Sequence, residues 1–372
     1  MYRTNYVEID ASAITGNARA LCRILAPGSG LMAVVKADGY GHGGPLAARA
    51  ALRGGAAMLA VATAEEGEAL RNAGIGAPVL VLGNVEPAGA EAAARLRLAQ
   101  TVCDRAGVAA LEKAARALGT RVPVHLKLDT GMARLGVRDT GEAVALAKAI
   151  AESEWLGYAG LFTHFACADD PDDAYTRMQR RRFADMLRAI EGAVGLPPIR
   201  HAANSAATLR FPETHFELVR AGIALYGAPP VACDVALRPA MRWVTRASMV
   251  KDLPRGACVS YGATYTARRP MRLMVLPVGY ADGYRRALSG RAQVLVRGRR
   301  APIVGAVCMD MCMADVTGVP GCEAGDEVVL LGRQGGAYIT ADQLAGWMDS
   351  IAYEALLAPG ARVPRIARGE AP

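Results

Sequence analysis

Several apolar, β-branched segments of this sequence end in polar or ionisable residues. A single lysine at a strand end is ordinarily solvated, and a single histidine in an apolar strand is ordinarily a core residue. Several such residues that meet at one edge of a sheet would instead form a binding or catalytic site. The residues are Lys36 in AVVKADGYGHG, Lys127, Asp129 and Arg134 in HLKLDTGMARLGV, His164 in LFTHFACAD, Asn204 and Ser205 in HAANSAAT, and Arg220 and Gly222 in ELVRAGIALYG.

Two of these segments also have the composition of a phosphate site. The small residues around Ser205 and the pair Gly222-Ile223 permit a ligand to approach backbone amides closely. A lysine near such a site, such as Lys36, could form a Schiff base with a cofactor that carries a phosphate.

The first part of the chain must position these residues, and in it eight predicted strands alternate with helical segments. This alternation indicates a parallel sheet, and eight strands over roughly 230 residues fit a TIM (β/α)8 barrel, whose chemistry lies at the carboxyl ends of the strands. The predicted strands are 31–37, 58–63, 78–82, 99–103, 122–128, 160–165, 199–202 and 218–221, and the predicted helices are 43–53, 64–72, 105–118, 140–151 and 174–193.

The pattern changes after Pro239. Short apolar runs separated by Gly, Pro and Arg predict a mostly-β domain, and a helical pattern returns only at 341–357. We therefore predict an α/β fold with a barrel over residues 1–238 and a mostly-β domain over residues 239–372. The predicted strands of the second domain are 243–250, 271–277, 293–296, 301–307 and 327–331.

The composition is that of a globular chain with more than one domain. Its 372 residues exceed one usual core, and 52% of them are hydrophobic. The N-terminal segment lacks the apolar run of a signal peptide, no segment is apolar enough to span a bilayer, and the eight cysteines form no CxxC pair. We therefore expect a cytoplasmic protein with reduced cysteines, no metal site and no membrane partner. The net charge of +8 matches no nucleic-acid-binding motif, but its positive field would favour an anionic ligand.

Taken together, the motifs resemble those of the alanine racemases that depend on pyridoxal 5'-phosphate (PLP). The resemblance covers nearly the whole chain in the family's order and implies a PLP-binding barrel followed by a β domain. It also implies a head-to-tail homodimer with shared active sites that interconverts L- and D-alanine. The motifs are AVVKADGYGHG, KLDTGMARLG, FTHFACAD, ANSAAT, LVRAGIALYG, VSYGATY, PVGYADGYRR, CMDM and RVPR.

The resemblance assigns the two catalytic bases. Lys36 would carry the cofactor and act as one base, and Tyr261 in VSYGATY, supplied by the partner subunit, would act as the other. Racemisation removes the Cα proton on one face of a planar intermediate and returns a proton on the opposite face. Two opposed residues satisfy that geometry, since one residue would have to cross the plane.

Other residues would hold the cofactor. By resemblance, Arg220 faces the pyridine nitrogen and keeps it unprotonated, because a guanidinium does not give up its proton. This weakens the ring as an electron sink and discourages side reactions. His164 would lie beside the ring and hydrogen-bond with Arg220, and Asn204 is a further candidate. The phosphate ligands would be Tyr40, Ser205, Gly222, Ile223 and Tyr353.

The substrate contacts follow from the same resemblance. Arg134 would orient the cofactor's phenolic oxygen and the substrate carboxylate. Lys127 stands at a position that is often carbamylated in the family. A carbamate would pair with Arg134, whereas an unmodified amine would repel it. The backbone amide of Met309, from the partner subunit, would meet the substrate carboxylate, and Tyr284 and Tyr353 would narrow the entrance in favour of a small side chain.

Two departures from the family pattern carry no chemistry in this scheme. Ala133 stands where glycine is common and Met311 where many relatives have glutamine, and we expect both to affect packing only. Asp310, beside them in CMDM, would be structural.

Three alternatives stay open at this point. A racemase for serine or lysine would need a larger or more polar pocket. A PLP-dependent decarboxylase would have an acid at the pyridine nitrogen and a glycine-rich phosphate loop, which Arg220 and the present motifs oppose. A non-catalytic PLP-binding protein would resemble the barrel alone, without the domain that carries Tyr261. The sequence leaves open whether D-alanine would serve peptidoglycan synthesis or alanine would be catabolised.

Overall fold

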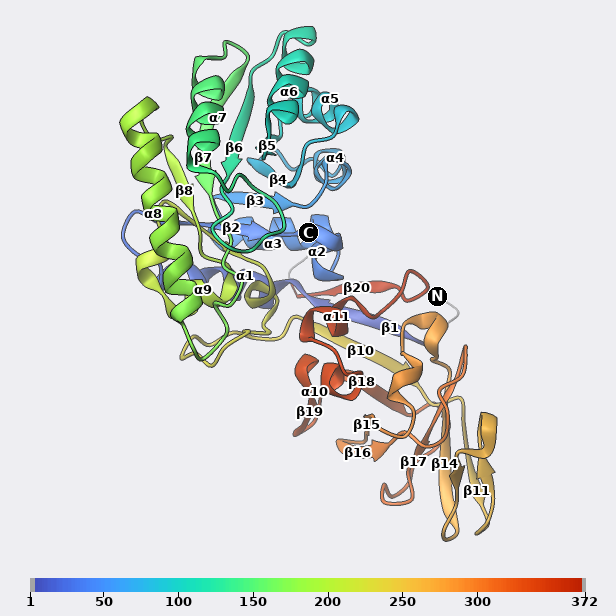
Figure 1. The fold of residues 1–372 in the computed structure, drawn as a ribbon. Helices are drawn as coiled ribbons and strands as arrows, with labels where there is room; N and C mark the ends of the chain where they lie inside the picture. Colours follow the sequence, from blue (N-terminus) through green and yellow to red (C-terminus); the bar gives the residue numbers. More distant parts are fainter. Residues whose placement is uncertain (1–3, 370–372) are drawn as a thin grey trace. The chain divides into compact units, whose positions relative to one another are not determined.

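The computed structural model describes residues 4–369. Its contacts divide the chain into two compact units. One comprises Ala13–Arg238, and the other comprises residues 4–12 together with residues 239–369. Each unit has its own sheets (Figure 1). Within residues 4–369, no helix combines the length and the apolar composition needed to cross a membrane.

The unit Ala13–Arg238 is a near-closed barrel of eight strands (Figure 1). Neighbouring strands follow the order β8-β7-β6-β5-β4-β3-β2-β9, and every pair is parallel. The amide of Arg220 in β9 donates to the carbonyl of Ala203, just beyond β8, at 2.9 Å, so the two ends of the sheet meet. The predicted TIM-barrel architecture is confirmed. The strands are β2 (Gly30–Val34), β3 (Met58–Val61), β4 (Val79–Asn84), β5 (Ala99–Val102), β6 (Val122–Lys127), β7 (Leu156–Phe162), β8 (Ile199–His201) and β9 (Leu218–Ala221).

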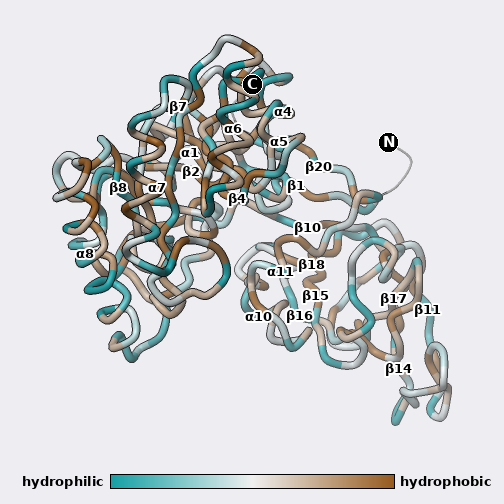
Figure 2. Tube along the Cα trace, turned by 45° about the horizontal axis from the view of Figure 1, so that its top comes forward, coloured by the Kyte–Doolittle hydropathy of each residue, from teal (hydrophilic) through white to brown (hydrophobic). Residues whose placement is uncertain are grey.

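Helices alternate with these strands, and several begin at a side-chain cap. Asp104 Oδ1 accepts the amide of Gly107 at 2.7 Å, and Asp139 Oδ1 accepts that of Glu142 at 2.8 Å, which satisfies amides that lack a partner at a helix start. Apolar residues follow the strands in Figure 2, as expected of a parallel sheet covered on both faces. The helices are α1 (Ala11–Arg23), α2 (Lys36–Tyr40), α3 (Gly44–Arg53), α4 (Ala64–Asn72), α5 (Pro87–Arg95), α6 (Arg105–Ala117), α7 (Thr140–Glu152), α8 (Ala174–Val194) and α9 (Ser205–Arg210), with 3-10 turns η1 (Pro212–Thr214) and η2 (Ile223–Tyr226).

The first strand, β1 (Tyr6–Asp10), belongs to the second unit and not to the barrel. It pairs antiparallel with β10 (Met241–Arg246) and parallel with β20 (Arg365–Arg368). The sequence prediction instead placed residues 1–238 in the barrel. Local patterns could not reveal the difference, because both partners of β1 lie more than 200 residues away along the chain, as the separations of 234 and 360 residues between bonded side chains illustrate.

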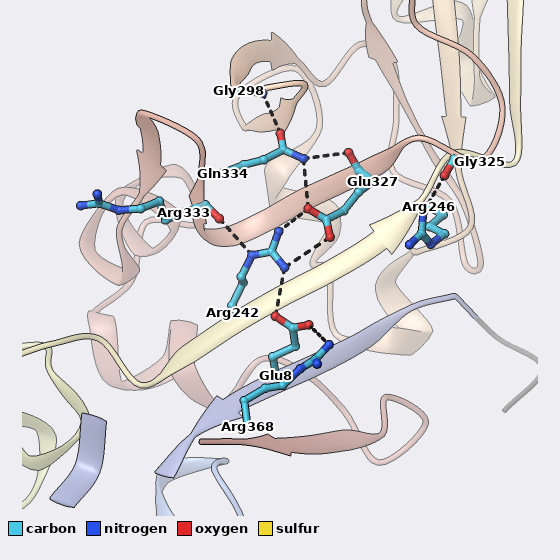
Figure 3. A network of polar contacts seen from close by, with 9 residues as sticks. All are labelled: Glu8, Arg242, Arg246, Gly298, Gly325, Glu327, Arg333, Gln334 and Arg368. Carbon is cyan, nitrogen blue, oxygen red and sulfur yellow. Dashed lines mark hydrogen bonds and ion pairs between the residues drawn. The ribbon is translucent and has the colours of Figure 1, made fainter. Parts of the chain in front are cut away.

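Ion pairs join the strands of that sheet (Figure 3). Glu8 in β1 accepts from Arg242 in β10 at 3.0 Å and from Arg368 in β20 at 2.7 Å. Arg242 also pairs with Glu327 in β18 (Glu327–Gln334). One arginine therefore connects the N-terminal strand to two strands of the C-terminal part of the chain.

The second unit is mostly β, as predicted. Its large sheet has the order β16-β15-β18-β10-β1-β20, with β19 paired to β18, and a smaller sheet has the order β11-β14-β17. The predicted helix over 341–357 is interrupted at Asp349, whose φ of 53° cannot continue a right-handed helix. The remaining elements are β11 (Met249–Leu253), β12 (Cys258–Val259), η3 (Tyr261–Ala263), β13 (Tyr265–Thr266), β14 (Met271–Leu276), η4 (Tyr280–Asp282), η5 (Arg286–Leu288), β15 (Gln293–Val296), β16 (Arg299–Pro302), β17 (Cys312–Asp315), β18 (Glu327–Gln334), β19 (Ala337–Ile339), α10 (Ala341–Trp347) and α11 (Ala352–Leu357).

Candidate active site

Ionisable side chains converge at the carboxyl ends of the barrel strands. Lys36 follows β2, Lys127 ends β6, His164 follows β7 and Arg220 lies in β9. Burial holds the pKa of His164 well below its usual value, and the positive charges of Arg220, Lys127, Arg134 and Lys36 lower it further. The barrel therefore brings these five predicted residues into one electrostatic environment, which would attract an anionic ligand.

Lys36 opens a turn of left-handed backbone. Ala37, Asp38 and Tyr40 have φ values of 51°, 51° and 54° although each carries a Cβ atom, a conformation that costs roughly 1–2 kcal/mol per residue. Glu66 helps to hold the turn, because its Oε1 accepts the amide of Ala37 at 2.7 Å. Backbone strain of this kind persists where the surroundings fix it, and it clusters at functional sites.

Glu66 also acts on the amine of Lys36. Burial and the charge of Arg134 lower the pKa of Lys36, whereas Glu66 opposes that shift. A lowered pKa means that a larger fraction of the amine is neutral and nucleophilic at a given pH than in a solvated lysine.

A close-fitting cradle lies after β9. The Ser205 hydroxyl accepts the amides of Gly222 at 2.9 Å and Ala224 at 3.4 Å. A Cβ atom built on Gly222 would lie only 2.3 Å from the hydroxyl of Tyr40, so a side chain there would displace the tyrosine. The backbone of Gly222, which has no side chain, thus lies next to the hydroxyls of Ser205 and Tyr40. Ile223, which begins η2, follows Gly222 directly. This donor set fits a phosphate group.

Asn204, the weaker candidate, has a structural task. Its Oδ1 accepts the amide of Ala207 at 3.0 Å and caps α9, and its Nδ2 donates to the carbonyl of Phe165 at 3.4 Å. It fixes the start of the segment that carries Ser205.

Arg220 is held in place by side chains and backbone. Its Nη1 donates to His201 Nδ1 at 2.9 Å. Its Nη2 lies within hydrogen-bond distance of three acceptors, namely His164 Nδ1 at 3.0 Å and the carbonyls of Thr163 and Ala202, each at 2.9 Å. The predicted bond between His164 and Arg220 is present. Burial lowers the pKa of Arg220 to about 9, which leaves the guanidinium charged at neutral pH.

A second buried cation lies nearby. Lys127 is 5% exposed, and its Nζ is 5.4 Å from the ring centre of Phe162, the ring that Arg220 also contacts at 5.4 Å. Burial lowers the pKa of Lys127 to about 8, and the charges of Arg220 and Arg134 act in the same direction. The amine is therefore partly neutral near physiological pH.

Asp129 shapes the loop that leads to Arg134. Its Oδ1 accepts the amides of Gly131 and Ala133, each at 3.0 Å. Ala133 has a φ of 56°, a value that glycine adopts without strain. Ala133, for which the sequence predicted an effect on packing only, therefore strains the backbone.

Three residues of this neighbourhood were not predicted from the sequence: Glu66, His125 and His201. A signal was available for the two histidines, since each is a polar residue within a buried strand. Glu66 gave none, because it lies in an ordinary helical segment. Among the described residues, no group of three or more His, Cys, Asp or Glu side chains is arranged to hold a metal ion.

The predicted residues of the second unit divide into two kinds. Tyr261, Met309 and Tyr353 are 74%, 53% and 37% exposed. Tyr284 is fully buried and packs edge-on against Trp243, with ring centres 5.8 Å apart.

Tyr284 therefore cannot narrow an entrance, and that prediction is wrong. The first tyrosine of the same motif, Tyr280, is exposed instead. The motif GYADGYRR contains both tyrosines, and only the fold distinguishes the one that faces outward from the one in the core.

Three sequence motifs of the second unit are joined by one arginine. Arg362 of RVPR pairs with the buried Asp282 of GYADGYRR at 3.3 Å and with Asp310 of CMDM at 2.8 Å. Backbone bonds from Tyr280 to the carbonyl of Cys308 and from Ala281 to that of Met309, each 3.0 Å long, join the same two segments. Asp310 is thus structural, as the sequence analysis expected.

A parallel β/α barrel joined to a mostly-β unit defines a class of two-domain barrel proteins. The rim of this barrel carries a partly buried lysine, a buried arginine and a set of hydroxyl and amide groups suited to an anionic ligand. The family models for the alanine racemase N-terminal domain and C-terminal domain match residues 9–230 and 240–367. An alanine racemase of Symbiobacterium thermophilum is 48% identical over 371 residues, which cover 99% of this chain and 98% of that protein.

Solved structures agree with this match. The alanine racemase of the D-cycloserine producer Streptomyces lavendulae has a TM-score of 0.94 and 40% identity, covering 100% of this chain and 98% of that one. A histidine racemase of Leuconostoc mesenteroides has a TM-score of 0.90 and 29% identity, covering 99% of each chain. The chain belongs to the alanine racemase family.

Proposed function

We propose that this protein interconverts L- and D-alanine with PLP as its cofactor. One observation carries the proposal: Arg220 is a buried, charged arginine fixed by two histidines and two carbonyls at the strand ends that also hold Lys36. When bound, PLP makes the Cα proton of the attached amino acid removable. Lys36 is the residue that carries the cofactor.

The cradle residues hold the phosphate in this proposal. Tyr40, Ser205, Gly222, Ile223 and Tyr353 are the proposed phosphate ligands, through hydroxyl and backbone amide groups. Their fit is supported by the 2.3 Å clearance that excludes a side chain at Gly222. Arg220 keeps the pyridine nitrogen unprotonated, since even a pKa of about 9 leaves the guanidinium charged.

Arg134 and the backbone amide of Met309, the latter supplied by the partner subunit, bind the substrate carboxylate. Lys127 is the proposed carbamylation site. Its pKa of about 8 supplies a neutral amine that can react with carbon dioxide, and the product would replace a buried cation by an anion able to pair with Arg134.

Lys36 and Tyr261 are the two bases, and they act on opposite faces of the substrate. Tyr261 is 74% exposed within its own chain, which supports a role at the site of a second subunit in a homodimer with shared active sites.

Alanine is the proposed substrate, ahead of other amino acids. A relative with 48% identity is an alanine racemase, whereas the histidine racemase of the same fold shares 29%. Turnover measured with alanine, serine, lysine and histidine tests this ranking, and a larger kcat/KM for any of the other three would reject it.

Borohydride reduction of the PLP-loaded protein tests the cofactor assignment. Reduction should fix the cofactor on the peptide that contains Lys36, and labelling of another lysine would reject that role. The proposed location is the cytoplasm, where D-alanine would supply peptidoglycan precursors or alanine would be catabolised.

A further inference from the structure

Two buried histidines form a chain behind Arg220. His201, which ends β8, and His125, in β6, are 0% and 1% exposed. His201 Nδ1 is 2.9 Å from Arg220 Nη1, and its Nε2 is 2.9 Å from His125 Nδ1. The proposed function gives His125 no role, although a buried imidazole pair next to a buried cation is a costly arrangement.

The guanidinium of Arg220 determines the direction of the hydrogen bond to His201 and of the bond between His201 and His125. A guanidinium only donates, so His201 Nδ1 must accept from Arg220 and must carry no proton. A neutral His201 then carries its proton on Nε2 and donates it to His125 Nδ1. Burial, followed by the charge of Arg220, lowers the pKa of both rings, to about 3 for His125. Both are therefore neutral at working pH, as this chain of bonds requires.

The barrel is shaped to hold the second ring. His125 is the register partner of Gly160 in β7, and the β6–β7 pairing shifts between Val124 and His125. A Cβ atom at Gly160 would lie 2.2 Å from His125 Nδ1, the atom that accepts from His201. A side chain at Gly160 would therefore displace the acceptor.

Of the two terminal NH2 groups of Arg220, Nη2 is held by backbone carbonyls, whereas Nη1 contacts His201. In the described part of the chain, Nη2 is held by two carbonyls and His164, whereas the acceptor of Nη1 is His201. With His201 in its other tautomer, an N–H would face the N–H of Nη1 and the bond would be lost. The ring orientation and tautomer of His201 thus decide whether the guanidinium of Arg220 is held at Nη1 as well as at Nη2.

We propose that His125 is a positioning residue that locks His201 in the Nε2–H tautomer and thereby orients Arg220 toward the reacting cofactor. The proposal rests on the proposed function only for what Arg220 faces, since the histidine chain itself lies within one unit.

The test compares His125→Phe, which removes the acceptor, with His125→Asn, whose side-chain oxygen can replace Nδ1. The readout is the ¹⁵N spectrum of imidazole-labelled, PLP-loaded protein, and the chain has only five histidines to resolve. Wild type and His125→Asn should show His201 protonated on Nε2. His125→Phe should show a mixture of tautomers, with kcat lowered roughly tenfold and KM within about twofold.

Gly160→Ala is the second variant, because it keeps His125 and displaces its ring, and it should reproduce the spectrum of His125→Phe. Thermal unfolding identifies the variants that fold. The proposal is overturned if His201 keeps the Nε2–H tautomer in whichever of His125→Phe and Gly160→Ala folds, or if His125→Asn fails to restore it. The tautomer is read without turnover, so a different substrate would reject the proposed function and leave this test intact.

Discussion

The residues at the barrel rim and the exposed residues of the second unit differ in where their chemical environment comes from. The rim cluster, Lys36, Lys127, His164 and Arg220, is placed within one unit. Burial lowers every pKa in it, and neighbouring positive charges lower those of Lys36, Lys127 and His164 further. The outer set, Tyr261, Tyr280, Met309 and Tyr353, consists of residues that are at least one-third exposed in the single chain. The rim residues have their pKa values shifted by contacts within their own unit, so they need only a ligand. An exposed residue such as Tyr261 needs contacts from a second subunit before it has the environment of an active site.

Subunit complementation is the strongest test of this contrast. Lys36→Ala chains should be inactive alone, and Tyr261→Phe chains should retain only a small residual activity. When they are mixed and allowed to exchange, about a quarter of all sites should contain both bases and recover activity, since half of the dimers are mixed and each has one intact site. Activity is measured after exchange has been verified with differently tagged chains. As a control, differently tagged Lys36→Ala chains are mixed with each other, and they should recover no activity. Verified exchange of Lys36→Ala with Tyr261→Phe chains without recovery would show that each site lies within one subunit.

Tyr261→Phe alone should lower racemisation about 10²–10⁴-fold in both directions, because a general base is lost and equilibrium ties the two rates together. Exchange of the Cα proton with deuterated water distinguishes the bases. By the proposed assignment, D-alanine should still exchange through Lys36 while L-alanine should not. Equal residual exchange from both enantiomers would reject the two-base mechanism.

Lys127→Met should stabilise the protein at pH 7 when bicarbonate is absent. The folded-state pKa of about 8 lies below the ordinary 10.5, so below pH 8 the folded state holds a proton at a cost of about 3 kcal/mol. The unfolded chain binds more protons between pH 8 and 10.5, so the stability of the wild type rises across that window and the advantage of the variant should disappear. Urea unfolding at pH 7 and pH 10 measures the difference, and an advantage independent of pH would contradict this origin.

Arg362→Gln should have the smallest effect, about 1–2 kcal/mol of stability. This value lies between that of a surface pair and that of a buried one, because Asp282 is buried whereas Arg362 is not. The variant loosens the segments that carry Tyr280 and Met309 and leaves the rim cluster unchanged, so PLP bound to the barrel should keep its absorbance. Arg188→Gln, which breaks an exposed pair with Asp185, is the control and should change stability little. Equal changes in stability for the two variants would show that Arg362 does not hold the three motifs together.

Much of the fold could be predicted because its signals are local. Strands buried on both faces read as continuous apolar runs, and polar residues at their ends, such as Lys36 and Arg220, mark the rim of a barrel. Likewise, the shift from helical patterns to short runs separated by glycine and proline near Pro239 indicated the second unit. The family motifs then supplied roles that periodicity alone could not assign.

The sequence by itself therefore determined the barrel, the rim and the kinds of residue on it. Only the tertiary structure decided that β1 joins strands far along the chain, that Tyr284 is buried while Tyr280 faces outward, and that His125 lies behind Arg220 in the space left by Gly160. The physical reason is common to all three. Each depends on contacts between segments distant in sequence, where the packing of one strand against another, and not the local pattern, selects which side chains meet.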